Sequence, residues 1–362
     1  MESPSIMASN DLPWDIPPSW RPALDAAGRG AVVFLIGETD SGKSTLAAVL
    51  ASEAIAAGRR VAIVDADVGQ SSIGPPACVG LAMPRQQFTS FDDLAPDAVD
   101  FVGACSPAGH LLQAATSTGA LVNAARAAGC ETIIVDTTGM VSGGLARALK
   151  VAKIRLVDPD VIVAVQFEDE VEHLVAPYRT RKRPRVLRLP TSRAVRGRSR
   201  EERTANRQRR FAAYFKGAKL VEVPWRDAPV ENSPWTNGER VPGHMLAYCE
   251  ERLACEVVYA ERRADGIVLI VRGRIEPEGL HALRDSFGGT PHVIEAGSLE
   301  NLAVGLLGEK GETLAIGILE RVDFRTQRLF VYTPLEGVAQ VRGIRLGSLR
   351  LSRDGNQLGA GE

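Results

Sequence analysis

A stretch of nine residues, Gly37 to Thr45, constrains this chain more than any other part of it. It reads Gly-Glu-Thr-Asp-Ser-Gly-Lys-Ser-Thr and lies between two apolar runs, at 31–36 and 46–50. The spacing matches G-x-x-x-x-G-K-[ST], in which a glycine-rich loop between a strand and a helix turns its backbone N–H groups toward phosphate oxygens. The pattern therefore predicts a phosphate-binding loop and a bound nucleoside triphosphate.

Two side chains of this loop have specific expected roles. Lys43 supplies a positive charge for the β- and γ-phosphates, and the Ser44 hydroxyl can hold Mg²⁺ at the positive end of the following helix. The predicted nucleotide-binding residues are Gly37, Glu38, Thr39, Asp40, Ser41, Gly42, Lys43, Ser44 and Thr45.

Length and composition favour an ordinary globular protein of two domains. The chain has 362 residues and five scattered cysteines without a C-x-x-C pair, which is typical of a reducing compartment and indicates neither a disulfide framework nor a zinc site. It shows no apolar run of membrane-spanning length and no signal peptide at its start. We therefore expect a cytoplasmic protein that makes no membrane contact.

The net charge of −1 conceals a strong asymmetry. Between Arg179 and Arg210 there are thirteen Arg and one Lys against two Glu, so this segment carries 14 − 2 = +12 and the rest of the chain −13. Such a concentrated basic segment predicts a polyanionic ligand bound at one place.

The order of apolar runs indicates an α/β fold with a mostly parallel sheet flanked by helices. Buried strands are predicted at 31–36, 61–64, 98–102, 132–135, 161–165 and 186–189, with a helix at about 110–128. Ligands of such sheets bind beyond the carboxyl ends of the strands. We therefore expect Lys43, Asp67, Ser106 and Thr137 along one rim.

The pattern changes after about residue 245, where two hairpins are predicted, at 257–271 and 313–332. The expected organisation is an N-terminal arm at 1–30, a P-loop domain at 31–223 with a lid at about 192–216, and a linker at 224–244. A smaller β-rich domain at 245–352 and a disordered tail at 353–362 follow.

Acidic residues end the predicted strand at 61–64. Asp65 and Asp67 lie on the same side of it, and such a carboxylate can hold the Mg²⁺ shell or take a proton from an attacking hydroxyl. Gln70 can orient a water or a phosphate. A turn-forming role for these aspartates is the alternative.

The sequence Asp136-Thr-Thr-Gly139 resembles the Asp-x-x-Gly switch of GTPases, although the chain lacks the Asn-Lys-x-Asp motif that reads guanine. Thr137 and Gly139 can instead hold a substrate through a hydroxyl and a backbone N–H. A capping turn is the third interpretation.

An arginine-rich helix is predicted from Ser199, which forms a capping box with Glu202. Arginines then recur at helical spacing on one face, at 200, 203, 207 and 210. This pattern fits a lid that brings positive charge to a transferring phosphoryl group, and it also fits a grip on a nucleic-acid backbone. A solvated basic face is the alternative.

Together these motifs resemble the P-loop polynucleotide 5′-hydroxyl kinases, which include the kinase subunit of the mRNA 3′-end cleavage factor and the nucleolar pre-rRNA-processing kinases. Segments 317–321, 333–335 and 344–347 resemble the β-rich region of the second group. The motifs that carry the resemblance are Gly37 to Thr45, 65–70 with Pro75-Pro76, 103–107, 137–139, and Arg203-x-x-x-Arg207 followed by Tyr214-Phe215.

The resemblance implies transfer of the ATP γ-phosphate to the 5′-hydroxyl of RNA or DNA, with Mg²⁺. Asp67 would activate the hydroxyl and share the metal with Ser44, while Lys43, Arg203 and Arg207 would act on the phosphates. Substrate contacts are expected from Gln70, Ser106, Pro107, Thr137 and Gly139.

Two features depart from the family, and two other functions stay open. Met140 stands where members often carry a tryptophan that stacks on a base, and the N-terminal domain of eukaryotic members is reduced to about thirty residues. A nucleotide-switched protein of the GTPase or metallochaperone class is one alternative, and a catalytically silent RNA-processing scaffold is the other. Protein partners are left unassigned.

Overall fold

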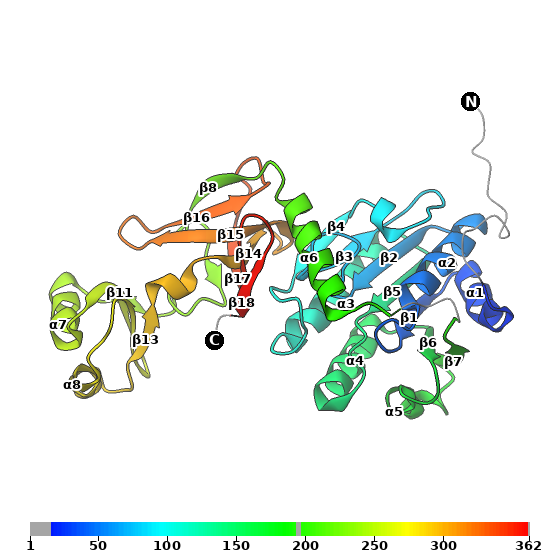
Figure 1. The fold of residues 1–362 in the computed structure, drawn as a ribbon, viewed down its shortest axis with the longest axis horizontal. Coiled ribbons are helices and arrows are strands. Elements are labelled where there is room, and N and C mark those ends of the chain that lie inside the picture. Colours follow the sequence, from blue (N-terminus) through cyan, green and yellow to red (C-terminus); the bar gives the residue numbers. More distant parts are fainter. Residues whose placement is uncertain (1–15, 193–196, 361–362) are drawn as a thin grey trace. The chain divides into compact units, whose positions relative to one another are not determined.

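The chain forms two compact units, residues 1–211 and 212–362. The computed structural model describes residues 16–192 and 197–360 (Figure 1). The boundary between the two units lies within helix α6 (Arg200–Tyr214).

The first unit is built on a twisted sheet in the order β4-β3-β2-β5-β1-β6-β7. Its five strands β2, β5, β1, β6 and β7 are parallel, and β3 and β4 pair antiparallel at one side. This confirms the predicted parallel sheet and adds β3. The strands are β1 (Val32–Ile36), β2 (Val61–Ala66), β3 (Cys78–Ala82), β4 (Ala98–Phe101), β5 (Thr132–Thr137), β6 (Val161–Gln166) and β7 (Arg185–Pro190).

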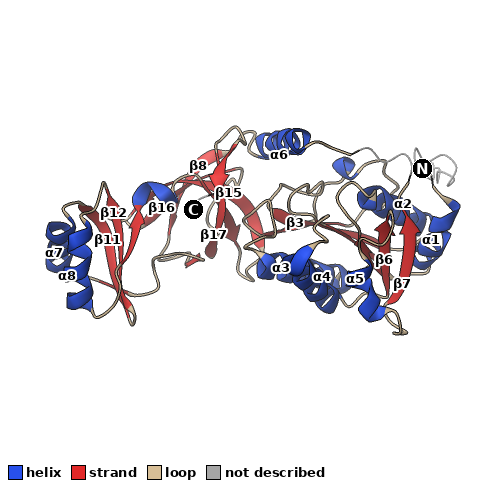
Figure 2. Ribbon diagram, turned by 60° about the horizontal axis from the view of Figure 1, so that its bottom comes forward, coloured by secondary structure: helices blue, strands red, loops and turns tan. Residues whose placement is uncertain are grey.

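Helices cover both faces of this sheet, which explains why its central strands are continuously apolar. Side chains alternate between the faces: in β1, Val33 and Leu35 pack with α1 and α2, whereas Phe34 packs with α3 and α4. Figure 2 shows these two helical layers. The helices are α1 (Arg21–Gly28), α2 (Lys43–Ala56), α3 (Leu111–Ala127), α4 (Gly143–Val157) and α5 (Glu172–Val175).

The beginning of the described chain is helical, not an extended arm as predicted. A short 3₁₀ turn, η2 (Pro18–Trp20), leads into α1. Trp20 is fully buried and its indole N–H donates to the carbonyl of Pro190, 3.3 Å away. Large apolar burial of this kind stabilises a helix that the local sequence indicates only weakly. Residues 1–15 of the predicted arm lie outside the described residues.

The second unit contains two sheets. One runs β18-β17-β14-β15, with β16 pairing both β15 and β8, and β9 pairing β17. Its strands are β8 (Lys219–Pro224), β9 (Val230–Glu231), β14 (Leu302–Leu307), β15 (Thr313–Asp323), β16 (Arg328–Thr333), β17 (Gly343–Leu351) and β18 (Gln357–Ala360).

The other sheet runs β10-β11-β12-β13 and packs with two helices. Its strands are β10 (Glu239–Arg240), β11 (Glu256–Arg263), β12 (Gly266–Arg272) and β13 (His292–Glu295), and the helices are α7 (Gly243–Leu253) and α8 (Pro277–Phe287). The two predicted hairpins correspond to β11–β12 and β15–β16, which confirms them.

Three predicted boundaries are corrected. The expected linker at 224–244 carries β9, β10 and the fully buried Trp235, so it belongs to a core. Residues 219–223, expected in the kinase domain, form β8 of the second unit by pairing with β16. The expected disordered tail contains β18, which pairs with β17. Each correction arises from pairing with distant strands that local composition does not show.

Within the described residues, none of the helices has the length and apolar character needed to span a bilayer.

Candidate active site

The phosphate-binding loop joins β1 to α2, as predicted. Gly42 has a φ of 87°, a left-handed conformation that glycine adopts without strain. Gly37 is needed for space, because a Cβ there would lie 2.5 Å from both the Ser41 hydroxyl and the Val165 carbonyl. These two glycines allow the loop to turn tightly beside β6 and to open directly into the N-terminus of α2.

Lys43 is buried inside this loop. Its ammonium donates to the carbonyl of Glu38 and, at 3.3 Å, to the hydroxyl of Ser41. Burial lowers the pKa of Lys43, and the nearby carboxylates of Asp136 and Asp67 oppose this shift. The amine is therefore held within the loop in which a β- or γ-phosphate would bind, with acidic groups close by.

The Ser44 hydroxyl donates to Asp136 at 2.5 Å. Asp136 is the penultimate residue of β5, the strand between β1 and β2. The sequence interpretation treated it as a switch or a cap, not as a site residue. Its Oδ1 atom is buried without a hydrogen-bond partner among the described residues, and burial raises its pKa. Because β5 pairs with β1 in parallel, the end of β5 lies beside the phosphate-binding loop, and this placement identifies Asp136 as a site residue.

Asp65 and Asp67 have different environments although both lie at the C-terminal end of β2. Asp65 is buried and accepts from the backbone N–H groups of Ser72, at 2.5 Å, and Ile73, at 3.1 Å, and from that of Asp67, at 3.1 Å. It fixes the loop that Asp67 begins. Asp67 is only partly buried, and its Oδ1 accepts from the N–H groups of Gly69 and Gln70.

Loop 67–70 packs against loop 103–107. A Cβ at Gly69 would lie 2.8 Å from the carbonyl of Cys105. Ser106 is exposed and its hydroxyl accepts from the Ala108 N–H at 3.3 Å, whereas Pro107 is buried. The structure thus brings the Ser106 loop to the Asp67 loop, as the rim prediction required.

The predicted substrate contact of the Thr137 hydroxyl is corrected. This side chain is fully buried: it donates to the Leu35 carbonyl at 2.8 Å and accepts from Lys150 at 2.6 Å. Gly139 instead lies against the phosphate-binding loop, since a Cβ there would come within 2.3 Å of the Thr39 nitrogen and hydroxyl. The 137–139 segment therefore supports the loop through close backbone packing.

Two buried lysines of α4, Lys150 and Lys153, lie beneath these strand ends, and the sequence interpretation missed both. Each is fully buried. Burial lowers the pKa of Lys153 to about 8 and that of Lys150 well below its usual value. In a sequence, lysines in a helix ordinarily indicate a solvent-exposed face. The burial of Lys150 and Lys153 is evident only once the fold packs α4 against the strand ends.

The lid helix α6 begins with the predicted capping box. Ser199 accepts from the Glu202 N–H at 3.1 Å, and Glu202 accepts from the Ser199 N–H at 2.7 Å. Arg203 forms a 2.6 Å ion pair with Asp40 of the phosphate-binding loop, and the Arg198 N–H donates to the same carboxylate. Partial burial acts to raise the pKa of Asp40, but these two contacts lower it overall.

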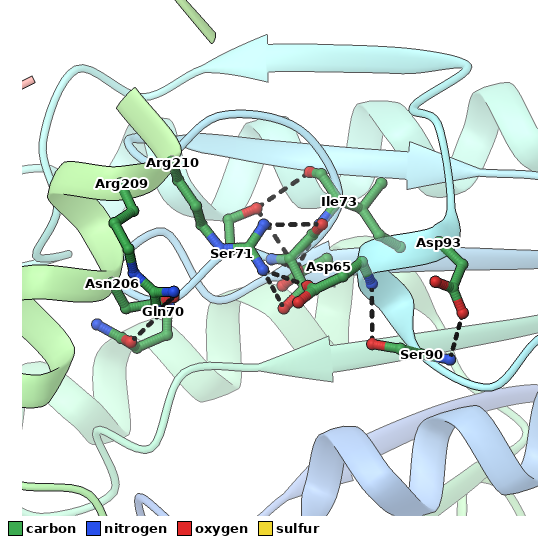
Figure 3. A network of polar contacts seen from close by, with 11 residues as sticks. Asp65, Gln70, Ser71, Ile73, Ser90, Asp93, Asn206, Arg209 and Arg210 are labelled. Atoms are coloured by element: carbon green, nitrogen blue, oxygen red, sulfur yellow. Dashed lines mark hydrogen bonds and ion pairs between the residues drawn. The ribbon is translucent and has the colours of Figure 1, made fainter. Parts of the chain in front are cut away.

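The next turns of α6 face the Asp67 loop. Gln70 donates to the Arg203 carbonyl at 3.4 Å and accepts from Asn206 at 3.5 Å. Figure 3 shows Asn206 and Arg209 beside Gln70, and Arg210 reaching over the loop held by Asp65. Arg210 contacts Ser72 and pairs with Asp92. The four residues 193–196 of the predicted lid lie outside the described residues.

The basic segment is divided between two places. Arg183 pairs with Asp158 and Asp160, and Arg188 pairs with Glu172 in a bidentate contact, so these two arginines serve the β6–β7 side of the sheet. Arg179, Arg181 and Arg185 also lie on that side, between α5 and the start of β7, whereas the arginines at 198, 200, 203, 207, 209 and 210 lie on or next to α6. The prediction of one basic surface is therefore corrected, because acidic partners far away in the sequence neutralise part of it.

The residues present fit a magnesium-bound triphosphate. Ser44 and the partnerless Oδ1 of Asp136 offer hard oxygen atoms next to the loop, which suits Mg²⁺. Among the described residues no group of three or more His, Cys, Asp or Glu side chains forms a metal cage. Such a site would therefore need phosphate oxygens to complete the coordination.

Comparisons with known proteins agree with this geometry. Residues 37–217 match the family model described as mRNA cleavage and polyadenylation factor CLP1 P-loop. A polyribonucleotide 5′-hydroxyl-kinase of Methanocaldococcus jannaschii is 33% identical over 329 residues, covering 90% of this chain and 89% of that protein. One of Pyrococcus furiosus is 31% identical, covering 91% and 90%.

A solved complex of Clp1p with Pcf11p has the same fold. Its TM-score is 0.57 at 13% identity, and the match covers 91% of this chain and 76% of that one. The family model matches half of this chain, and each of the two archaeal relatives is matched over most of its length. This chain therefore belongs to the CLP1 P-loop family, together with the archaeal polyribonucleotide 5′-hydroxyl-kinases.

Proposed function

We propose that this protein is an ATP-dependent polynucleotide 5′-hydroxyl kinase that phosphorylates RNA ends. The observation that carries the proposal is the contact between the lid and the phosphate-binding loop. Arg203 of the lid pairs with Asp40, which belongs to the same loop as Lys43 and Ser44. The archaeal relatives named polyribonucleotide 5′-hydroxyl-kinase support RNA as the acceptor. They favour neither the switch nor the scaffold alternative.

The nucleotide would be held by the loop and its lysine. Backbone N–H groups of residues 37–45 face the β- and γ-phosphates, and Lys43 turns its ammonium from Glu38 and Ser41 to phosphate oxygens. Mg²⁺ supplies charge neutralisation between these phosphates when it is bound. Ser44, held by Asp136, and Asp67 are the residues proposed to hold it.

Asp67 is proposed as the general base. The 5′-hydroxyl oxygen forms a bond to the γ-phosphorus while the bond from that phosphorus to the β–γ bridging oxygen breaks, and ADP leaves. The hydroxyl proton passes to the Asp67 carboxylate, which two backbone N–H groups hold in a fixed direction. Asp65, by contrast, is occupied by the loop and serves as its support.

Arg203 and Arg207 are proposed to stabilise the charge on the transferring phosphoryl group. The Nε–H groups of both are buried without a partner among the described residues, which leaves donors available on the lid. Gln70, Ser106 and the Gly139 backbone are proposed to face the polynucleotide end. Pro107, predicted as a substrate contact, is buried and belongs to the support of the Ser106 loop.

Transfer of labelled γ-phosphate from ATP to 5′-hydroxyl oligonucleotides tests the proposal. We expect label on an RNA oligonucleotide, and a parallel DNA oligonucleotide shows how strongly RNA is preferred. Lys43→Ala is the control, because it removes the ammonium from the loop and should abolish labelling. An oligonucleotide carrying a 5′-phosphate should take up no label.

Outcomes without transfer separate the alternatives. GTP hydrolysis in the absence of acceptor labelling would contradict the kinase assignment in favour of a switch. ATP binding without turnover, combined with salt-dependent RNA binding, would contradict it in favour of a scaffold.

A further inference from the structure

Helix α4 places two lysine side chains in the interior of the first unit. Lys150 and Lys153 are three residues apart, so they project from the same face of the helix. Both are fully buried. Taking an ammonium out of water is costly, and an apolar side chain of similar length would fill the same space without that cost. Their presence therefore requires a reason beyond packing.

Lys150 is hydrogen-bonded to the peptide between Thr138 and Gly139. Its ammonium donates to the Thr138 carbonyl at 2.5 Å and to the Thr137 hydroxyl at 2.6 Å, and that hydroxyl donates onward to Leu35 in β1. A trans peptide is planar, and its C=O and N–H point in opposite directions. Lys150 thus turns the Gly139 N–H away from α4. Gly139 is also the residue that packs on Thr39 of the phosphate-binding loop.

Lys153 is hydrogen-bonded to the peptide between Ala66 and Asp67, at the end of β2. Its ammonium donates to the Ala66 carbonyl at 3.1 Å. The other side of the same peptide is the Asp67 N–H, which donates to Asp65 at 3.1 Å. The peptide plane between Ala66 and Asp67 is therefore held from both sides, and this plane sets the direction in which the Asp67 side chain leaves the backbone.

Electrostatics support the same assignment. The cluster beneath the loop contains three lysines, at 43, 150 and 153, and three aspartates, at 65, 67 and 136, whose charges interact with one another. Burial lowers the pKa of Lys150 well below its usual value, whereas Lys153, with a pKa of about 8, keeps a positive charge beside the aspartates at neutral pH when Lys43 turns to a phosphate.

We propose that Lys150 and Lys153 are positioning residues of the phosphotransfer site, which fix the Thr138–Gly139 and Ala66–Asp67 peptides and thereby aim the Gly139 N–H and the Asp67 carboxylate. The inference rests on the proposed function of Asp67 and deepens it. Neither lysine touches the substrate. They act through the backbone at the ends of β5 and β2.

Lys150→Met and Lys153→Met in the full chain test the proposal. Displacing a reacting group by about 1 Å can cost a hundredfold in rate. We expect kcat for RNA phosphorylation to fall by about tenfold to a hundredfold in each variant. The rate is measured at a temperature well below the thermal unfolding midpoint of that variant. Equilibrium ATP binding should change by less than about twofold, because the loop itself keeps its contacts. Lys150→Met should also raise KM for the oligonucleotide.

Leu149→Ala is the matched control. Leu149 is fully buried in the same helix, and its truncation leaves a cavity without removing a contact to either peptide. Its kcat per folded molecule should stay near that of the wild type, although its stability falls. Lys182→Met, at an exposed lysine, controls for loss of charge alone. If Leu149→Ala lowers kcat as much as the lysine variants do, the proposal is overturned.

A second readout separates this inference from the proposed function. The amide ¹H–¹⁵N resonances of Gly139 and Asp67 should shift in Lys150→Met and Lys153→Met, respectively, and stay in place in Leu149→Ala. Wild-type protein that transfers no phosphate would refute the kinase assignment, whereas unmoved amide resonances would refute the positioning role. The lysines hold separate peptides, so either variant is sufficient if the other does not fold.

Discussion

Gly139 illustrates how a single atom can matter at this site. A Cβ there would come within 2.3 Å of the Thr39 nitrogen, closer than any real contact, so either the loop or the 137–139 segment would have to move. We expect Gly139→Ala to weaken equilibrium ATP binding at least tenfold and to cost about 1–3 kcal/mol of unfolding free energy, which is usual for overpacking. Calorimetric titration and thermal unfolding measure both.

Gly144→Ala is the control for this substitution. An added Cβ at Gly144, five residues later at the start of α4, would meet nothing within 4 Å. This variant should bind ATP like the wild type and gain slightly in stability, because alanine has the higher helix propensity. Equal ATP affinity in the two variants would show that close packing on Thr39 is unimportant.

The aspartates at the ends of β2 and β5 should separate into two roles. Asp67→Asn removes the proposed base, so the rate of transfer should fall by about 10²–10⁴-fold while ATP still binds. Asp136→Asn removes the charge opposite Ser44, and we expect the Mg²⁺ concentration needed for half-maximal rate to rise. Steady-state rates across a Mg²⁺ titration distinguish them. Asp67 is also a proposed Mg²⁺ ligand, so the distinguishing result is that saturating Mg²⁺ restores the rate of Asp136→Asn but not that of Asp67→Asn. Recovery of Asp67→Asn at saturating Mg²⁺ would contradict its role as the base.

At the scale of elements, the lid depends on one carboxylate of the loop that it covers. Asp40 accepts from Arg203 and from the Arg198 N–H. Its negative charge also lies in the loop that receives phosphates, so Asp40→Asn should both release Arg203 and remove repulsion. We expect ATP affinity to rise several-fold, measured by titration without acceptor. Asp92→Asn releases Arg210 in the same manner and serves as the control. Lower ATP affinity in Asp40→Asn would contradict this account.

In the second unit, one buried carboxylate holds the segment before β10 against β11. Glu261 is fully buried, pairs with Arg263 at 2.7 Å, and accepts from the backbone N–H groups of Thr236 and Asn237. Removing one partner of a buried pair leaves the other uncompensated. Glu261→Ala should therefore cost about 3 kcal/mol of unfolding free energy, measured by denaturant titration. The exposed pair residue Glu256 is the control, with a loss below about 1 kcal/mol expected for Glu256→Ala.

These elements also show which features the sequence could predict. The loop, the parallel strands and the capping box of α6 are local patterns, and the structure contains all three. The segment at 224–244 was predicted to be a linker from its prolines, which are visible in the local sequence. The burial of Trp235 depends instead on residues about ninety positions away, such as Phe324. Asp136, Lys150 and Lys153 were not predicted for the same reason, since their partners come from other helices and strands.

At the scale of the whole molecule, the net charge of −1 does not describe how a polynucleotide would meet the protein. The basic segment carries +12, but its members at 183, 188, 203 and 210 pair with carboxylates. Arg207 and Arg209 bond instead to the uncharged side chains of Thr204 and Asn206. Arg200, at the start of α6, is exposed. With Arg203 released from Asp40, about four cations of the lid can contact phosphates.

This count predicts the salt dependence of RNA binding. Each phosphate neutralised on a single strand contributes about −0.7 to the slope of log K against log salt, so four contacts give a slope of about −3, whereas twelve would give about −8. Arg207→Gln should reduce the magnitude of the slope by about 0.7. Arg183→Gln, in the part of the segment paired with Asp158 and Asp160, should leave it unchanged. Fluorescence anisotropy with a labelled 5′-hydroxyl RNA measures the slope, and a value near −8 would mean that the polynucleotide displaces the internal carboxylates.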